Sequence, residues 1–576
     1  MPAKCRPLAT YEGLGGLTAQ VVGPDGRLYL SYMYVDSTIE LVAVDPETGR
    51  HEVLPNPAPT ESGAWGLAVG SDGCIYLGTL PHAHLLRYNP SSRAYEDLGR
   101  PAPSESYIWA LASGADGRMY GATYPSAKLV RFDPASGISE DLGRLDPEEM
   151  YARHIAAGRD GFVYIGIGTR RANIVAHEIA TGERRAILPE PQRITGTARV
   201  WVAADGEVYA EAPGQRYHLC GWEAAPVATA PAAPPPRLAD GRSARVEGGS
   251  PAVLRVWDTD GSLSREAPLA YRGRPVRIFR LCQGPEGALY SSTVLPLNVW
   301  RVDPVSGEGK DLGRHGGGEC YTLLAHGGQV LMAAYAASGP LMALTPDTGT
   351  IRAVHFPGED SAWRPQALVA GPDGRVYAGA VAGYGRLGCF LVAWDPGTDK
   401  VSVARDVVEE QAISSLAWSG NLLVGGTSVG GGGGSTPTRT DACLFLWDPV
   451  RECKVWEGVP VPGAGSITDL LTHPDGLVYG FAGTTAFAFN PVARSVVRAA
   501  SAPGSVRGLI YNAVALRPDG QIWGCDSQGV FSLDPATLVV TRLAEAPQPV
   551  SAGFALDGDT VYFACGATVW RCEIAP

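Results

Sequence analysis

Residues 65–100 read WGLAVGSDGCIYLGTLPHAHLLRYNPSSRAYEDLGR, and residues 109–144 read WALASGADGRMYGATYPSAKLVRFDPASGISEDLGR. Residues 153–187 give a third copy, RHIAAGRDGFVYIGIGTRRANIVAHEIATGERRAI. The shared pattern is an apolar segment, an Asp-Gly turn, a second segment with an aromatic residue, a loop, a third segment, an Asp-Pro turn and a fourth segment. Alternating apolar and polar residues between the turns predict half-buried antiparallel strands.

The two turns explain how four strands fold back on one another. Asp-Gly suits a two-residue hairpin in which both central residues need positive φ. In Asp-Pro-x-x-Gly the proline presets φ, and the glycine takes the left-handed conformation. Each copy is therefore predicted to be a four-stranded antiparallel sheet.

The first turn recurs along the whole chain of 576 residues, mostly at spacings of 44 to 47 residues. It falls at Asp25, Asp72, Asp116, Asp160, Asp205, Asp240, Glu286, Gly327, Asp373, Ser419, Asp475, Asp519 and Asp557. This spacing is typical of one β-propeller blade, and one ring usually holds four to eight blades. We therefore predict an all-β fold of tandem β-propellers, with about 13 four-stranded antiparallel blades in two rings of roughly 7 and 6.

The predicted domains are residues 1–315 and residues 316–576. The last repeat ends after three strands, so the segment from Arg6 to Tyr11 is expected to supply its fourth strand. In its repeats the chain resembles the broad group of sugar- and quinone-enzyme-like propellers and the lyase propellers related to streptogramin lyase. This resemblance implies the fold, and no catalytic motif of these families is matched residue by residue.

Composition and net charge restrict the classes of partner that this protein is expected to bind. A net charge of −12 and a pI near 5.4 argue against nucleic-acid binding, which needs a basic face. We find no secretory signal and no membrane-spanning run, so a soluble, cytoplasmic protein is expected. The 11 cysteines include no CxxC pair, so neither a disulfide framework nor a zinc site is predicted. Cys74, Cys282 and Cys565 are expected to be buried thiols.

Blade topology sorts the candidate functional residues onto one face. Both hairpin turns lie on one face of a ring, and the loops between strands two and three lie on the other, with the connections between blades. That second face carries the unusual residues, and loops on one rim of a rigid scaffold often form binding sites. The substrate-binding candidates are Trp65, Trp109, Arg153, Arg170, Arg171, Arg199, Lys128, His82 and His84. The catalytic candidates are His154, Tyr151 and Tyr124. The second half contributes Tyr321, Tyr335, Trp363, Arg364, Tyr384 and Arg386.

These residue types favour a carbohydrate-active enzyme, a lyase that cleaves a uronate-containing oligo- or polysaccharide by β-elimination. Arginine would neutralise the uronate carboxylate and make the neighbouring C–H more acidic. His154, or Tyr151, would take that proton, and Tyr124 would protonate the leaving oxygen. Neighbouring cations are expected to lower the pKa of His154 and to keep it a neutral base.

Three alternatives remain open at this point. Glu105, Glu148 and Glu149 are candidates for a glycosidase pair. His82 and His84, with His154, are candidates for a divalent metal site. A non-catalytic binding or scaffold protein with a protein partner is the third. The glycine run from Gly430 to Gly434 lacks the Gly-Lys-Ser/Thr of a phosphate loop, so it is expected to be a flexible surface loop.

Overall fold

The computed structural model describes residues 4–249, 251–355, 364–502 and 513–574. The described elements are all β-strands apart from one 3-10 turn at Glu190–Gln192, so the chain is all-β as predicted. Contacts divide it into two units. We call Gly13–Arg274 the inserted unit, and Met1–Glu12 with Pro275–Pro576 the host unit.

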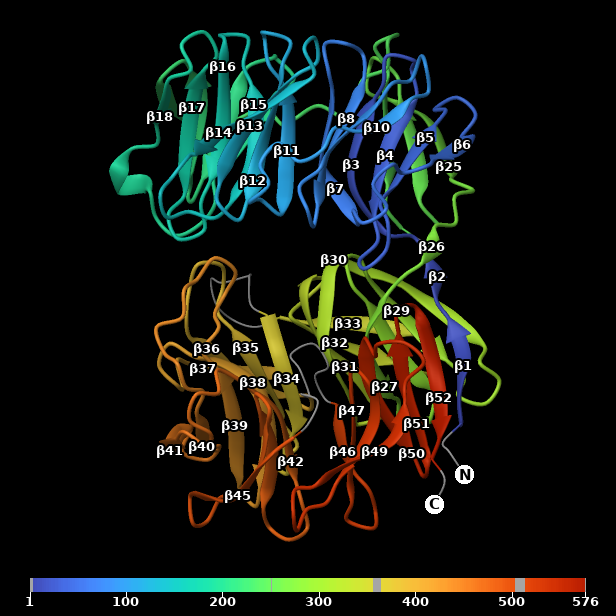
Figure 1. Ribbon diagram of the computed structural model, residues 1–576, viewed down its shortest axis with the longest axis vertical. Helices are drawn as coiled ribbons and strands as arrows, with labels where there is room; N and C mark the ends of the chain where they lie inside the picture. Colours follow the sequence, from blue (N-terminus) through green and yellow to red (C-terminus); the bar gives the residue numbers. More distant parts are fainter. Residues whose placement is uncertain (1–3, 250, 356–363, 503–512, 575–576) are drawn as a thin grey trace. The chain divides into compact units, whose positions relative to one another are not determined.

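The inserted unit consists of consecutive antiparallel sheets, most of them four-stranded (Figure 1). Its strands are β3 (Gly16–Val22), β4 (Leu28–Met33), β5 (Glu40–Val44) and β6 (His51–Leu54); β7 (Gly63–Val69), β8 (Ile75–Leu80), β9 (Leu85–Tyr88) and β10 (Tyr95–Asp97); β11 (Tyr107–Ser113), β12 (Met119–Tyr124), β13 (Lys128–Asp133) and β14 (Ile138–Arg144); β15 (Ala152–Ala157), β16 (Phe162–Ile167), β17 (Asn173–Glu178) and β18 (Arg184–Ala186); β19 (Arg199–Val202), β20 (Val208–Ala212), β21 (Gln215–Cys220) and β22 (Glu223–Val227); and β23 (Ser243–Glu247), β24 (Val253–Trp257) and β25 (Leu263–Pro268).

The host unit repeats this arrangement, with two of its sheets joined through the long strand β30. Its strands are β1 (Lys4–Thr10); β27 (Ile278–Gln283), β28 (Leu289–Thr293), β29 (Leu297–Val302), β30 (Gly309–His326), β31 (Gln329–Ala337), β32 (Leu341–Thr345) and β33 (Thr350–Val354); β34 (Arg364–Ala370), β35 (Val376–Val381), β36 (Cys389–Asp395) and β37 (Lys400–Arg405); β38 (Ala412–Ser419), β39 (Leu422–Ser428), β40 (Leu444–Asp448) and β41 (Cys453–Gly458); β42 (Ile467–Thr472), β43 (Val478–Ala482), β44 (Thr485–Asn490) and β45 (Ser495–Ser501); β46 (Val514–Leu516), β47 (Ile522–Asp526), β48 (Gly529–Leu533) and β49 (Val540–Glu545); and β50 (Ala552–Asp557), β51 (Thr560–Cys565) and β52 (Thr568–Glu573). The short strands β2 (Glu12–Gly13) and β26 (Arg274–Pro275) pair where the chain passes from one unit to the other.

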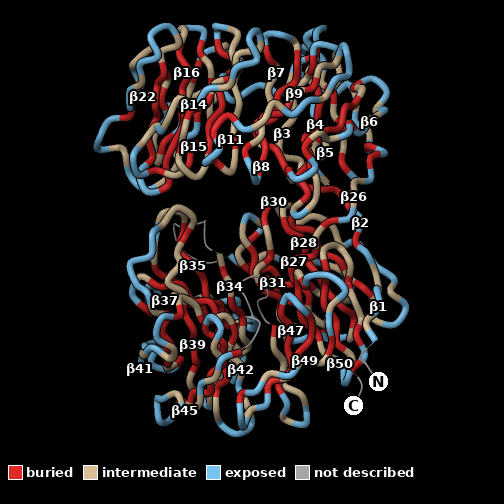
Figure 2. Tube along the Cα trace, viewed as in Figure 1, coloured by how far each residue is buried: buried red, intermediate tan, exposed pale blue. Residues whose placement is uncertain are grey.

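The hydrophobic core lies between neighbouring sheets. Every residue of the second strands β4, β8, β16 and β35 is buried, whereas the fourth strands β37 and β45 alternate between exposed and partly buried residues (Figure 2). A strand that is buried along its whole length must be covered on both faces of its sheet. The clusters bear this out: Tyr76 and Leu85 of one sheet pack against Met119 and Phe132 of the next. The sheets are therefore stacked face to face, as blades are.

The first strands of successive sheets contact one another. In the inserted unit β3, β7, β11, β15 and β19 form such a series, and β23 contacts β3. In the host unit the series runs through β27, β30, β34, β38, β42, β46 and β50, and β50 contacts β27.

The Asp-Gly turn differs from the predicted two-residue hairpin. Gly26 has φ +78°, but Asp25 is not among the residues with positive φ, and the Gly26 N–H donates to the Gly23 carbonyl at 3.0 Å. These features define a three-residue loop, in which a tight turn is followed by one left-handed glycine. The Asp-Pro turn is as expected, since its glycines, such as Gly49 at φ +73°, take the left-handed conformation.

The turn aspartate anchors the aromatic residue that follows it by four positions. The Tyr76 hydroxyl donates to Asp72 Oδ2 at 2.8 Å, while Asp72 Oδ1 accepts the Cys74 N–H at 3.1 Å. Burial and the Asp72 carboxylate together raise the pKa of Tyr76. The same tyrosine-to-carboxylate bond occurs in eight sheets, at Tyr29, Tyr76, Tyr120, Tyr164, Tyr209, Tyr290, Tyr377 and Tyr479.

The N-terminal strand completes the last sheet, because β1 pairs with β52 in antiparallel register. A disulfide joins Cys5 to Cys572, which face each other in this pair. Such bonds persist in oxidising compartments and are rare in the cytosol, so the predicted cytoplasmic location is wrong. The expectation of free thiols holds for Cys74 and Cys565, which are buried and unpaired.

The predicted boundary at residue 315 falls inside β30, which pairs with β29 on one side and β31 on the other. The contacts instead place Gly13–Arg274 between the first strand of the host unit and the rest of it. The repeat spacing continues through both units, so it does not mark the residue at which the inserted unit ends.

The anchoring bond gives a first prediction. We expect Tyr76→Phe to lower the free energy of unfolding by about 1–3 kcal/mol, because a buried hydrogen bond to a carboxylate is lost. Tyr95→Phe is the matched control in the same sheet, because the buried Tyr95 hydroxyl has no hydrogen-bond partner among the described residues. Urea unfolding checks both variants. Equal losses of stability would contradict a special role for the turn aspartate.

Candidate functional site

A β-bulge occurs near the start of ten described first strands. At each bulge one residue of the first strand has no partner in the register with the second strand. These residues are Thr18, Trp65, Trp109, Arg153, Phe279, Tyr321, Gln366, Ser414, Thr468 and Phe554. Bulges re-aim side chains and are common beside functional sites. The bulged residues are therefore the natural place to look for a site.

In the inserted unit three successive bulged residues stack on one another. The Trp65 and Trp109 rings are 4.1 Å apart and inclined by only 13°. The Arg153 guanidinium lies 4.7 Å from the Trp109 ring centroid. An arginine over an indole ring is a favourable cation–π contact. Trp65, Trp109 and Arg153 thus form one continuous stack across three sheets.

Three tyrosines extend this stack. Tyr107 lies 5.3 Å from Trp109 and 5.2 Å from Tyr124, and Tyr124 lies 4.5 Å from Tyr151, all between ring centroids. The Arg153 guanidinium lies 5.1 Å from the Tyr151 ring. Burial raises the pKa of Tyr107. We call the set of Trp65, Tyr107, Trp109, Tyr124, Tyr151 and Arg153 the aromatic row.

His154 and Arg199 lie beside the aromatic row. Burial, together with the charges of Arg199 and Arg153, lowers the pKa of His154 to about 4, so the imidazole is neutral at pH 7. Arg199 begins β19, and its side chain is exposed. Within the described ranges of the chain no carboxylate forms an ion pair with Arg199. A neutral base and an unpaired guanidinium thus adjoin the row.

The other predicted site residues are held by acidic partners outside the row. His82 Nδ1 is 2.7 Å from Glu61 Oε1, and His84 Nδ1 is 2.9 Å from Asp97. Lys128 binds Asp141 at 2.6 Å. The exposed Arg171 pairs with Glu190, and Arg170 lies 3.9 Å from Glu148. The structure does not bring these five residues together with His154.

The metal alternative finds no geometric support. His82 and His84 turn toward different carboxylates, and His154 belongs to a separate first strand. In the parts of the chain that the structure describes, no three His, Cys, Asp or Glu side chains are grouped so as to hold a metal ion.

Three buried glutamates, Glu61, Glu105 and Glu149, bind neighbouring loops, a role that we did not predict from the sequence. Glu105 is 1% exposed and accepts the Thr123 hydroxyl and the Ser126 N–H, both at 2.9 Å. Glu149 accepts the Arg171 N–H at 2.7 Å, and Glu61 accepts the Thr79 hydroxyl at 2.6 Å. Each glutamate stands four residues before a bulged residue, a spacing that the sequence does display. Glu105 and Glu149 therefore anchor loops, which argues against their use as a glycosidase pair.

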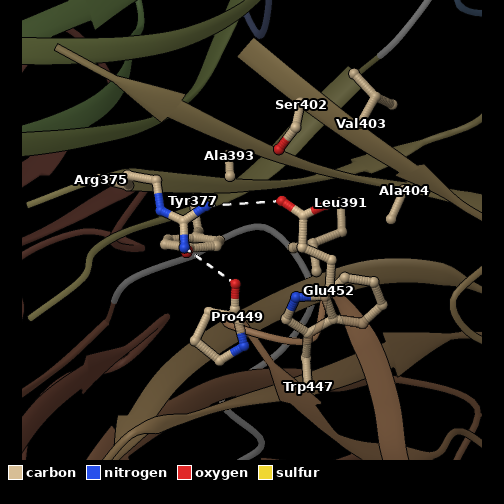
Figure 3. Close-up of a pocket in the computed structure, with 10 residues that line it drawn as sticks. All are labelled: Arg375, Tyr377, Leu391, Ala393, Ser402, Val403, Ala404, Trp447, Pro449 and Glu452. Carbon is tan, nitrogen blue, oxygen red and sulfur yellow. Dashed lines mark hydrogen bonds and ion pairs between the residues drawn. The ribbon is translucent and has the colours of Figure 1, made fainter. Parts of the chain in front are cut away.

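The host unit contains a pocket of about 260 Å³ between its sheets β34–β37 and β38–β41 (Figure 3). Arg375 donates to the Pro449 carbonyl at 3.1 Å and to Asp373 at 2.8 Å, and it lies 3.9 Å from Glu452. The charged groups of the pocket pair with one another. We therefore interpret the pocket as part of the packing contact between two sheets.

Comparisons with known proteins were made on the whole chain. No protein-family model matches, and no curated protein matches. The extracellular domain of the putative one component system BT4673 from B. thetaiotaomicron has a TM-score of 0.37 and 12% identity, over 99% of this chain and 82% of that chain. PorZ, described as an essential bacterial surface component of the type-IX secretion system of Porphyromonas gingivalis, has a TM-score of 0.39 and 11% identity, over 99% and 87%. The extracellular domain of the putative hybrid two component system BT3049 from B. thetaiotaomicron has values of 0.37 and 14%, over 96% and 68%.

Among the described residues there is no helix with the length and apolar character needed to cross a membrane.

The buried, neutral His154 predicts a loss of stability in acid. Its pKa of about 4 in the folded chain lies below the ordinary value of 6.5, so the unfolded chain takes up the proton first as the pH falls. The stabilisation present above pH 6.5 is therefore lost progressively down to pH 4, by roughly 3 kcal/mol. Urea unfolding at pH 7 and pH 4.5 should show a smaller loss for His154→Gln than for the wild type. Equal losses would contradict the lowered pKa.

Proposed function

We propose that each unit is a closed β-propeller, with six blades in the inserted unit and seven in the host unit. The series of contacts between first strands supports closure of the host unit, because β50 contacts β27 and β1 adds the fourth strand to the last blade. In the inserted unit the Gln20 side chain binds the backbone of Val246 through both its oxygen and its nitrogen, which joins β3 to β23. On this arrangement the aromatic row lies around one end of the central channel.

We propose that the inserted unit binds a carboxylate-bearing saccharide at this end. The observation that carries the proposal is the position of the unpaired guanidinium of Arg199, next to His154 and close to a rigid stack of aromatic rings. Arginine binds a carboxylate through two parallel hydrogen bonds. Much of the Trp109 ring is covered by its neighbours, so the row serves as a rigid wall for a sugar ring.

A binding measurement tests this proposal. We expect oligogalacturonate or glucuronate oligosaccharides to bind with measurable heat, and the neutral galactose or glucose counterparts to bind far more weakly. Arg199→Ala should weaken uronate binding at least tenfold, because a desolvated charge-assisted contact is lost. Arg216→Ala is the matched control, since Arg216 lies on the same sheet and pairs with Glu211 at 3.4 Å. Equal weakening in both variants, or no binding of any uronate, would remove the proposal.

A second candidate function is β-elimination on the same ligand, and the neutral state of His154 favours it. A neutral imidazole can accept the proton next to the uronate carboxylate at pH 7, and Arg199 would stabilise the charge that develops there. Tyr124 would return a proton to the leaving oxygen. The carbon–oxygen bond breaks as the new carbon–carbon double bond forms, so no oxidant or cofactor is required.

Absorbance near 235 nm follows this reaction, because the product is an unsaturated uronate. We expect a rise with the wild type and with His218→Ala, whose histidine lies on β21 beside Glu207. His154→Ala should lose the rise while it keeps the binding heat. If uronates bind but the absorbance stays flat, the protein is a binding module. If no saccharide binds, a rigid platform for a protein partner becomes the better interpretation.

A further inference from the structure

One buried position of the third strand is hydrophobic in every sheet with an anchored tyrosine except one. The position lies opposite the residue that precedes this tyrosine, and it is buried in all eight sheets. The seven hydrophobic residues are Val44, Tyr88, Phe132, Leu219, Val302, Trp394 and Phe489. The eighth residue is His177, which pairs with Val163 and is 2% exposed. An imidazole thus stands where the repeat otherwise uses a hydrophobic side chain.

His177 packs into the contact between sheets β11–β14 and β15–β18, which we call the His177 joint. Its ring centroid is 5.7 Å from that of Tyr120 in the preceding sheet. In the joint before this one, Phe132 lies 5.8 Å from Tyr76 in the same way. Side chains alternate along a strand, so Val175 shares a face of β17 with His177, and Val175 belongs to the same core cluster as Tyr120. The imidazole is therefore part of an apolar interface.

Both ring nitrogens of His177 are buried and have no hydrogen-bond partner within the described residues. A neutral imidazole carries one donor and one acceptor, and a protonated one carries two donors. A phenyl ring, as in the neighbouring joint, would leave no polar group unsatisfied. What an imidazole offers and a phenyl ring does not is a proton that is exchanged near neutral pH.

The charged groups around the His177 ring favour its neutral form. Arg184 is its register partner on β18, and Arg131 acts on the ring from β13. Asp116, in the turn before β12, opposes them, but its carboxylate already accepts the Tyr120 hydroxyl at 3.0 Å. Burial and the two guanidinium groups lower the pKa of His177 to about 4, so the ring is neutral at pH 7.

A proton on His177 would add a further positive charge beside two guanidinium groups in this joint. The neighbouring carboxylates are engaged, because Glu140 pairs with Arg131, and Asp116 lies 3.5 Å from Arg118. In an open joint the imidazole would be in water and would titrate near pH 6.5, whereas in the closed joint it titrates near pH 4. The equilibrium between the closed and the open joint therefore shifts toward the open form by about twentyfold between pH 7 and pH 5.

We propose that His177 is an acid-sensitive switch, and that proton uptake in mildly acidic solution opens the His177 joint. The aromatic row crosses this joint, because Trp109 belongs to β11 and Arg153, 4.7 Å from its ring, belongs to β15. Opening the joint breaks this stack and releases a ligand held against it. The release of ligand rests on the proposed saccharide site, whereas the opening itself does not.

Thiol labelling of the full chain measures the opening without any ligand. The parent chain carries Val175→Cys, which places a thiol in the joint, and His154→Gln, because His154 lies in the same sheet and also titrates in acid. The labelling rate at position 175 with a dithiodipyridine reagent is divided by that of the urea-unfolded chain at the same pH. We expect this ratio to rise about twentyfold from pH 7 to pH 5. Adding His177→Phe, the residue found at Phe132 in the neighbouring joint, should abolish the rise.

Cys74 is the internal control, since it is a buried free thiol in the preceding joint, where Phe132 takes the equivalent position. Its labelling ratio should stay constant. A constant ratio at position 175, an undiminished rise with His177→Phe, or an equal rise at Cys74 would each refute the proposal.

A second variant decides the matter even if His177→Phe does not fold. Arg184→Gln removes a neighbouring positive charge, so it should raise the pKa of His177 and make the rise in labelling smaller. Arg185→Gln is the matched control, because Arg185 is the next residue along β18 and pairs with Glu183 at 2.7 Å. This control should keep the full rise. Equal behaviour of the two variants would count against the switch.

Uronate binding at pH 7 and pH 5 tests the release of ligand. With His154 intact, His177→Phe should lose less affinity than the wild type between these two pH values. An equal loss in both proteins would show that the joint does not control the aromatic row. If no uronate binds at either pH, the proposed function fails, and the labelling experiment still decides whether the joint opens.

Discussion

The hydrogen bond between the turn aspartate and the tyrosine four residues later is the contact on which the architecture rests. One carboxylate oxygen holds the turn through a backbone N–H, and the other holds a ring that is buried between sheets. The bond therefore couples a local event, the hairpin, to a non-local one, the packing of neighbouring sheets. Gly70, two residues before the aspartate, is part of the same arrangement. A Cβ atom at this position would lie 2.6 Å from both Asp72 and the Tyr76 ring. Seven occurrences of this contact, and an eighth in which Glu286 takes the place of the aspartate, keep the turn ends of the sheets uniform.

The turn ends of the sheets are uniform, whereas the side chains at the opposite ends of the sheets vary. In ten of the described first strands the bulge recurs at an equivalent register position, while the bulged residue changes from threonine to tryptophan, arginine, phenylalanine or serine. A single backbone irregularity thus presents a different side chain from each sheet at the same level. Stacking follows where large flat groups occupy successive bulges, as at Trp65, Trp109 and Arg153. The chemistry of the proposed saccharide site is decided at a few such positions and at their immediate neighbours.

Local signals in the sequence predicted the strands and the repeat, because turn glycines and alternating residues act over a few positions. The pairing of the N-terminal segment with the last sheet also followed, since a sheet with three strands leaves an open edge. The register of the strands, and the side-chain pairs that depend on it, could not be predicted. Nothing in the sequence marks Trp65 as bulged, and Cys5 and Cys572 are separated by 567 residues. The acidic partners of His82, His84 and Lys128 could not be predicted for a related reason, because they follow from strand register or loop conformation.

The insertion of one unit after the first strand of the other has a consequence for biosynthesis. As the chain leaves the ribosome, β1 emerges before the inserted unit, whereas its partner β52 emerges after the inserted unit and the rest of the host unit. Gly13–Arg274 has its own core and can complete its contacts while β1 still has an unpaired edge. The host unit cannot close until β52 has been made. A chain truncated before β52 would therefore retain a folded insert within a host unit that cannot close, and the unpaired edge of β1 would be open to pairing with other chains.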